Sequence, residues 1–173
     1  MSRKTLLITL LIALMTACAP QATPTAAPAA TDITLTDGLG REIKLAAPAQ
    51  HVVSLAPSNT EILFAIGAGS QVVGRDEFSD YPAEAASIES VGGSMGQYSA
   101  EAIVALKPDL VLAAEINTPE LVKQLEDLGL TVYYLKNPLT LEEMYVNLEI
   151  VGQLTGHDVT ELVDSLKARV AAV

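Results

Sequence analysis

The stretch that decides the fold reads HVVSLAPSNTEILFAIGAG (51–69), SQVVGRDEFSDYP (70–82) and VGGSMGQYSAEAIVALKPDLVLA (91–113). Each of these three segments contains a short run rich in valine and leucine, a pattern typical of strands buried on both faces of a parallel sheet. Between the runs lie segments of helix length, which Ser58 and Ser99 open. The alternation predicts an α/β fold.

The rest of the chain extends this alternation in both directions. Residues 33–45 alternate between apolar and polar side chains around Asp37–Gly40, which predicts a β-hairpin. The strands predicted after it are 52–55, 72–74, 88–91, 110–113 and 131–135. The predicted helices are 59–66, 100–106, 118–128, 140–154 and 158–173, with a cap at Thr118 and a capping box at Thr140–Glu143. The predicted fold class is therefore a three-layer α/β lobe around a central, mostly parallel sheet.

The N-terminus has the features of a secretory signal. Arg3 and Lys4 precede an apolar run at 6–15, and two small residues then precede Cys18. This run is too short to span a bilayer comfortably. We therefore predict a lipoprotein signal peptide at 1–17 and a lipid anchor on Cys18. The alternative is an ordinary signal peptide followed by an incidental cysteine.

The segment after Cys18 supports anchoring. Residues 19–31 consist only of alanine, proline, threonine and glutamine, so they have nothing with which to bury a core. We predict a disordered tether at 18–32, which reaches about 40 Å when extended. The prediction is an exported protein that its lipid holds on a membrane, facing the periplasm or the cell exterior.

Composition excludes several classes of partner and site. The predicted signal holds two of the ten basic residues, which leaves eight basic against 21 acidic side chains. Such a chain has no basic stripe for nucleic acid or for anionic lipid head groups. With two histidines and one cysteine, a His/Cys metal site is not expected. No G-x-G-x-x-G follows a strand, so we predict neither a dinucleotide nor another cofactor.

Loops that leave the carboxyl ends of the predicted strands form the candidate site, because open parallel sheets bind ligands at that edge. They are 56–60, 75–81, 92–98 and 114–117. The residues expected at a ligand are Pro57, Ser58, Asn59, Arg75, Phe78, Tyr81, Met95 and Tyr98. Aromatic and thioether faces beside amides and hydroxyls suit a large, flat, partly apolar metal chelate such as a corrin, a porphyrin or a siderophore complex.

The ordered motifs V-S-L-A-P-S-N-T-E, V-V-G-R, S-D-Y-P, V-G-G and L-K-P-D-L-V resemble one lobe of a known family. It is the N-terminal lobe of the periplasmic binding proteins that deliver cobalamin, ferric siderophores or haem to ABC importers. The resemblance implies such a lobe at 33–156 and, at 157–173, the start of a helix that crosses to a second lobe. We expect the chain to be a truncated product or fragment, the alternative being a self-sufficient one-lobe protein. The apolar stripe of the last helix (Leu162, Leu166, Val170) should then be incompletely covered.

The resemblance also assigns roles to single residues. Phe78 and Met95 align best with ligand-contacting positions. Glu101 corresponds to a glutamate that docks into arginines of the membrane permease, so the permease and its ATPase are the implied partners. As a structural alternative, a carboxylate in the first turn of a helix is favoured by about 0.3–1 kcal/mol through the helix dipole.

Several candidate residues have structural alternatives as well. Ser58 and Glu61 form a capping box by their spacing, and Asn59 can cap the same helix. Tyr81 with the following proline can pack a turn, and Asp80 can hold that turn through an Asx bond. The V-G-G motif indicates a tight backbone path.

Three acids in the second loop leave another function open. Asp76, Glu77 and Asp80 can be read as the acid and base of a small exported α/β enzyme of the hydrolase kind. No histidine, nucleophile elbow or metal cluster accompanies them, so we predict a binding protein without catalytic residues. Arg75, the only base in these loops, either contacts an anionic ligand edge or pairs with Asp76 or Glu77.

Overall fold

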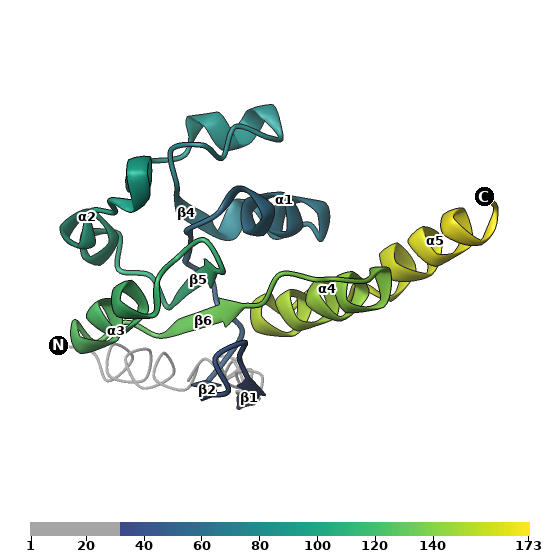
Figure 1. Ribbon diagram of the computed structural model, residues 1–173, viewed down its shortest axis with the longest axis horizontal. Helices are drawn as coiled ribbons and strands as arrows, with labels where there is room; N and C mark the ends of the chain where they lie inside the picture. Colours follow the sequence, from purple (N-terminus) through teal and green to yellow (C-terminus); the bar gives the residue numbers. More distant parts are fainter. Residues whose placement is uncertain (1–31) are drawn as a thin grey trace, which may run out of the picture.

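A central parallel sheet organises the protein in the computed structural model, which describes residues 32–173 (Figure 1). The sheet has four strands in the order β4-β3-β5-β6. They are β3 (Val52–Ser54), β4 (Val72–Arg75), β5 (Leu110–Ala114) and β6 (Val132–Leu135). The predicted signal peptide, the Cys18 anchor and nearly all of the predicted tether lie outside the described residues.

Helices cover both faces of this sheet. On one face lie α1 (Pro57–Ala65), α4 (Leu141–Thr155) and a hairpin of β1 (Ile33–Thr36) and β2 (Glu42–Leu45). On the other lie α2 (Ala100–Ala105) and α3 (Pro119–Asp127). Short 3-10 turns are η1 (Gly69–Gln71), η2 (Ala83–Ser87) and η3 (Ser94–Gly96). The predicted three-layer α/β fold with a parallel sheet is confirmed.

Side-chain alternation along β5 generates the two cores. All five residues of this interior strand are buried. Leu110 and Leu112 belong to the cluster under α1 and α4, whereas Val111 and Ala113 belong to the cluster under α2 and α3. Because both sets of alternate side chains meet an apolar layer, the strand is a continuous apolar run in the sequence.

The helix caps agree with the sequence in three places. The side chains of Ser99, Thr118 and Thr140 each accept a hydrogen bond from the backbone N–H three residues on, at the starts of α2, α3 and α4. The box at Thr140 is complete, since Glu143 also binds back to the backbone N–H of Thr140. Gly156 ends α4 in the left-handed conformation, with φ of 78°.

Two local predictions are wrong. Ser58 and Glu61 form no capping box, because α1 begins two residues earlier than predicted, at Pro57, with Ala56 in the N-cap position. Proline suits the first helical turn, where its missing N–H removes no helical hydrogen bond. The strand predicted at 88–91 is reduced to a single bridge between Ser90 and Arg75.

The hairpin turn is anchored against β6 through Asp37, which is 6% exposed. Its carboxylate accepts hydrogen bonds from the backbone N–H groups of Leu39 (3.0 Å), Arg41 (2.9 Å) and Tyr134 (3.3 Å). The Arg41 guanidinium pairs with the same carboxylate and with Glu126 of α3 at 2.6 Å. The turn therefore covers part of an edge strand and links it to a helix on the other face.

The last helix, α5 (Thr160–Ala171), projects away from the sheet beyond α4 (Figure 1). Leu162 and Leu166 are half-buried against the core, but Val170 is 47% exposed. The apolar stripe of this helix is incompletely covered, as predicted. Among residues 32–173, no helix combines the length and the apolar character needed to cross a membrane.

Asp37 should make the stability of this lobe depend on pH. Burial by itself would raise the pKa of Asp37, but the hydrogen bonds and charge of Arg41, with the N–H of Leu39, outweigh burial and hold that pKa below its ordinary value. A carboxyl group with a lowered pKa stabilises the fold above its unfolded-state pKa of about 3.9. That stabilisation is lost as the pH falls through the lower, folded-state pKa.

We therefore expect Asp37→Ala to lower the free energy of unfolding by roughly 2–3 kcal/mol at neutral pH, because three backbone N–H groups lose their acceptor. Urea denaturation followed by circular dichroism measures this difference, which should shrink as the pH approaches 3. The exposed Asp164 on α5 supplies the control, since Asp164→Ala should change stability by less than about 0.5 kcal/mol. A difference for Asp37→Ala that stayed constant from pH 7 to pH 3 would contradict this account.

Candidate ligand-binding site

Large apolar side chains stand exposed on the loops at the carboxyl edge of the sheet. Phe78 (57% exposed) and Tyr81 (67%) follow β4, Met95 (95%) lies before α2, and Ile116 (65%) follows β5. Single exposed apolar residues are ordinary, but four on neighbouring loops at one edge form a surface suited to a ligand. We refer to these four residues as the apolar rim. The sequence predicted all of them except Ile116.

A buried hydrogen-bond network holds the loop that carries Phe78. Asp76, which is 1% exposed, accepts a hydrogen bond from the Phe78 N–H at 2.9 Å and another from the Ser79 hydroxyl. The Ser79 hydroxyl also lies 2.8 Å from that of Thr60 on α1, which donates to Ser54 of β3 at 2.8 Å. Polar side chains thus tie this loop to a strand and a helix of the core.

The same network bears on the acids of this loop. Asp76 accepts from the Phe78 N–H, whereas Asp80 is exposed and its side chain makes no hydrogen bond among the described residues, so the Asx bond considered for Asp80 at the Tyr81 turn is absent. Of the three acids, Glu77 and Asp80 are exposed and Asp76 is buried. With both carboxylate oxygens of Asp76 bonded internally, these residues do not form a paired acid and base.

A second network joins the loops around Tyr98. Its hydroxyl donates to the carbonyl of Leu55 at 2.9 Å and accepts from the side-chain amide of Asn117 at 2.9 Å. The other end of that amide accepts from the Ala114 N–H at 2.8 Å. Burial raises the pKa of Tyr98, and the charge of Asp76 adds to the rise despite the opposing bond from Asn117. The hydroxyl has structural partners, so a ligand contact by Tyr98 stays a prediction.

The V-G-G motif forms the tight backbone path that the sequence predicted. Gly92 has φ of 91°, and a Cβ atom there would lie 2.8 Å from the carbonyl oxygen of Gln97. Met95, at the tip of this loop, also has a positive φ, of 51°. The loop thus presents the Met95 side chain to solvent, where its contact with a ligand stays a prediction.

Arg75 is used inside the protein. Its guanidinium donates to the backbone carbonyls of Asp76 (2.8 Å), Ala85 (2.9 Å) and Ala86 (3.2 Å), which holds η2 beside β4. Among the described residues it forms no ion pair with the side chain of Asp76 or Glu77, so that alternative is wrong. Three of its N–H donors already bind backbone carbonyls. A ligand contact by Arg75 stays a prediction.

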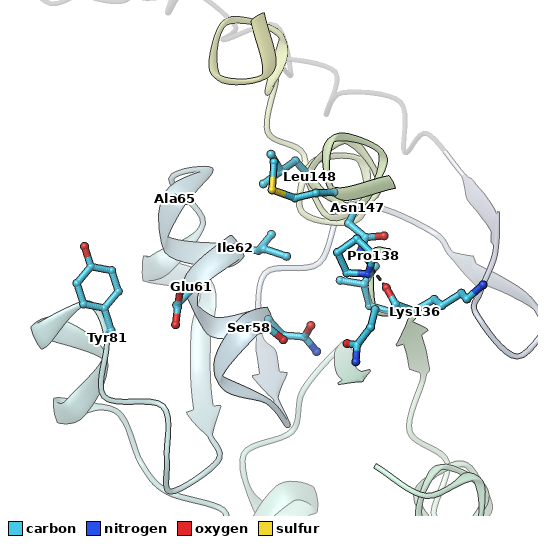
Figure 2. A pocket seen from close by; sticks show the side chains of 13 residues that line it. Ser58, Glu61, Ile62, Ala65, Tyr81, Lys136, Pro138, Asn147 and Leu148 are labelled. Atoms are coloured by element: carbon cyan, nitrogen blue, oxygen red, sulfur yellow. Dashed lines mark hydrogen bonds between the residues drawn. The ribbon is translucent and has the colours of Figure 1, made fainter. Parts of the chain in front are cut away.

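A cleft of about 370 Å³ opens between α1 and α4, at the carboxyl end of β6 (Figure 2). We refer to it as the α1–α4 cleft. Tyr81 of the apolar rim lies on its margin, so the cleft adjoins the exposed apolar surface. Its polar lining comes from Ser58, Asn59, Glu61, Asn137 and Asn147, and its apolar walls include Ile62, Ala65, Met144 and Leu148.

The first turn of α1 brings Pro57, Ser58 and Asn59 to this edge. Ser58 is exposed at the cleft, whereas Asn59 is 1% exposed. The Asn59 amide donates to the carbonyl of Leu112 in β5 at 3.0 Å. Asn59 is therefore no helix cap, and its bond across the sheet was not predicted. Ligand contacts by these three residues remain predictions.

Sequence reasoning missed part of the cleft. Lys136 and Asn137 directly follow the strand predicted at 131–135, so the rule applied to the other strand ends could have found them. Asn147 lies within α4, and nothing in the sequence separates it from a solvent-facing helical residue. Among residues 32–173, no three histidine, cysteine or acidic side chains converge as metal ligands.

Glu101 lies apart from this edge region. It is exposed in the first turn of α2, on the opposite face of the sheet from α1 and α4. It lines an open hollow of about 500 Å³ between α2 and α3, together with Val104 and Leu128. A partner at Glu101 could therefore bind without entering the α1–α4 cleft.

Two relatives carry a similar sequence. The uncharacterized ABC transporter substrate-binding lipoprotein YvrC of Bacillus subtilis is 35% identical over 141 residues, covering 79% of this chain and 44% of that protein. The vitamin B12-binding protein of Vibrio campbellii is 39% identical over 107 residues, covering 61% of this chain and 38% of that protein. The chain thus spans somewhat less than half the length of these relatives.

Solved structures show the same fold. The periplasmic vitamin B12 binding protein BtuF of Vibrio cholerae matches with a TM-score of 0.61 and 33% identity, over 72% of this chain and 49% of that one. A periplasmic heme binding protein from Pseudomonas aeruginosa matches with a TM-score of 0.62 and 33% identity, over 70% and 43%. The family described as periplasmic binding protein matches residues 52–172, which confirms the resemblance found in the motifs. The chain belongs to this family of periplasmic binding proteins.

Proposed function

We propose that this protein is the substrate-binding component of an ABC importer and that it captures a metal chelate for delivery to a membrane permease. Family membership supports this role, since similar proteins are named as an ABC transporter substrate-binding lipoprotein and as vitamin B12-binding proteins. The permease and its ATPase are the proposed partners.

The observation that carries the proposal is the apolar rim. Phe78, Tyr81, Met95 and Ile116 stand more than half exposed at the edge where parallel sheets bind ligands. One exposed side chain of this kind is ordinary, but several on loops at the same edge of a sheet are typical of a surface that meets a partner. A broad chelate with an apolar face would cover several of them at once, which a single ion or a small sugar would not.

The charges at the carboxyl edge limit the kinds of ligand that can bind there. Glu77, Asp80 and Glu115 are exposed at this edge, while the Arg75 guanidinium donates to backbone carbonyls. A highly anionic chelate such as a tris-catecholate complex would need several free cations there. We therefore favour a corrinoid or a weakly charged ferric siderophore.

The enzyme alternative has little support. A hydrolase built on Asp76, Glu77 and Asp80 needs two of these carboxylates to act together, but Asp76 is buried and bonded within its loop. Membership in a family of binding proteins favours capture over turnover.

The proposal includes a lipid anchor on Cys18. It rests on the signal-like N-terminus and on the uncharged tether, and YvrC is likewise named a lipoprotein. The lipid would hold the protein outside the cytoplasm, within reach of the permease.

Cys18→Ser should release the protein from membranes, because the thiol that receives the acyl chains is removed. Membrane fractionation and incorporation of labelled palmitate measure this. Thr23→Ser, a change within the tether, should leave both unchanged. Membrane association that survives Cys18→Ser, together with no uptake of labelled lipid by the wild type, would rule the anchor out.

Phe78→Ala and Tyr81→Ala should each weaken ligand binding roughly tenfold, since each removes apolar area that the ligand would cover. The measurement is calorimetric titration of the protein from its full reading frame with cyanocobalamin and with ferrioxamine B. Leu39→Ala, which removes an exposed apolar side chain in the hairpin turn, should leave affinity unchanged. Unaltered binding by both rim variants would contradict the proposed ligand surface.

Glu101→Ala should spare ligand binding and reduce uptake into cells by about tenfold or more, because the permease would lose a charged partner. Uptake of labelled ligand is measured in a strain that lacks the wild-type gene. Glu120→Ala removes a similarly exposed acid from the first turn of α3 and should have a smaller effect. Equal uptake by wild type and Glu101→Ala would show that Glu101 has no docking role.

A further inference from the structure

Two side-chain amides that line the α1–α4 cleft accept no hydrogen bond from the described part of the protein. The Asn59 amide donates to the carbonyl of Leu112 at 3.0 Å. The Asn147 amide donates to the carbonyl of Lys136 at 2.9 Å (Figure 2). A carbonyl only accepts, so these bonds determine which end of each side chain is the oxygen. Among residues 32–173, no donor bonds to the side-chain oxygen of either asparagine. Neither oxygen is among the described side-chain atoms that are fully buried without a partner, so both remain accessible from the cleft. Both side chains line the cleft.

One cation, Lys136, is among the residues that line the cleft. Figure 2 shows its side chain running away from α1. Glu61 adds a carboxylate to the α1 wall and forms no ion pair within the described part of the chain. The cleft therefore favours a group that donates hydrogen bonds and disfavours an anion.

The walls and the size of the cleft limit this group further. Ile62, Met144 and Leu148 make the walls largely apolar, so a full ammonium charge would lose more hydration free energy there than a neutral amide. A volume of about 370 Å³ lies near the lower end of whole-ligand pockets, which hold about 300–1,000 Å³. It suits one arm of a chelate whose body lies on the apolar rim.

We propose that the α1–α4 cleft is a subsite for a neutral carboxamide arm of the ligand and that it discriminates against a carboxylate at the same position. The N–H groups of the arm donate to the side-chain oxygens of Asn59 and Asn147. A carboxylate offers only acceptors and meets the negative charge of Glu61. This inference rests on the proposed function, because it assumes a chelate at the apolar rim.

Cyanocobalamin and its monocarboxylic acid derivatives, in each of which one peripheral carboxamide is replaced by a carboxylate, test the subsite. Calorimetry uses the protein from its full reading frame. At least one derivative should bind wild type about tenfold more weakly than cyanocobalamin. Glu61→Lys should reduce that ratio to near one, because it replaces an anion in the cleft by a cation. Glu149→Lys makes the same charge change on an exposed position of α4 outside the cleft and should keep the ratio.

The outcomes separate the subsite from the proposed function. Equal affinity of wild type for cyanocobalamin and every derivative, or an equal shift in both lysine variants, would overturn the subsite and leave chelate binding intact. Preference for haemin, which carries two carboxylates, over cyanocobalamin would also overturn the subsite and leave chelate binding intact. Failure to bind cyanocobalamin, haemin and ferrioxamine B alike would overturn the proposed function, and the subsite with it.

Discussion

Burial of β3 and β5 on both faces is the constraint on which the rest of this structure depends. Alternate side chains of these strands enter two separate apolar cores, so helices must cover both sides of the sheet. The connections that return over those faces make the strands parallel, and parallel strands all end at one edge. The loops after β3, β4, β5 and β6 therefore meet there. One requirement of packing determines both the fold and the place of the proposed ligand site.

At that edge the polar and the apolar side chains have different tasks. Asp76 and Asn117 are 1% exposed, and Asp76 bonds within its own loop while Asn117 bonds to neighbouring loops. Phe78 and Met95, by contrast, stand in solvent. The polar networks hold the loops in place before any ligand arrives. A ligand that then covers the apolar side chains loses little free energy to ordering the backbone, which is the physical basis of a preorganised site.

The charged side chains also divide between structural roles and the proposed ligand edge. Arg41 pairs with Asp37 and Glu126, and Arg75 binds backbone carbonyls, so two cations near the sheet serve the fold. The proposed ligand edge carries neutral amides, exposed acids and the exposed Lys136, a balance that favours a neutral hydrogen-bonding ligand over a highly anionic one. Glu101 lies on the other side of the sheet, so the proposed ligand surface and the proposed docking surface are separate.

The sequence by itself determined the features that depend on near neighbours. Apolar runs marked the strands, and the caps at Ser99, Thr118 and Thr140 marked three helix starts, because strand burial and capping both leave short-range patterns. Only the tertiary structure decided which site residues are free to meet a ligand. Asn59 bonds to a carbonyl 53 residues away and Tyr98 to one 43 residues away, so each is tied by a partner that no local pattern reveals. A side chain's type limits the bonds that it can make, but the folded chain selects which of them form.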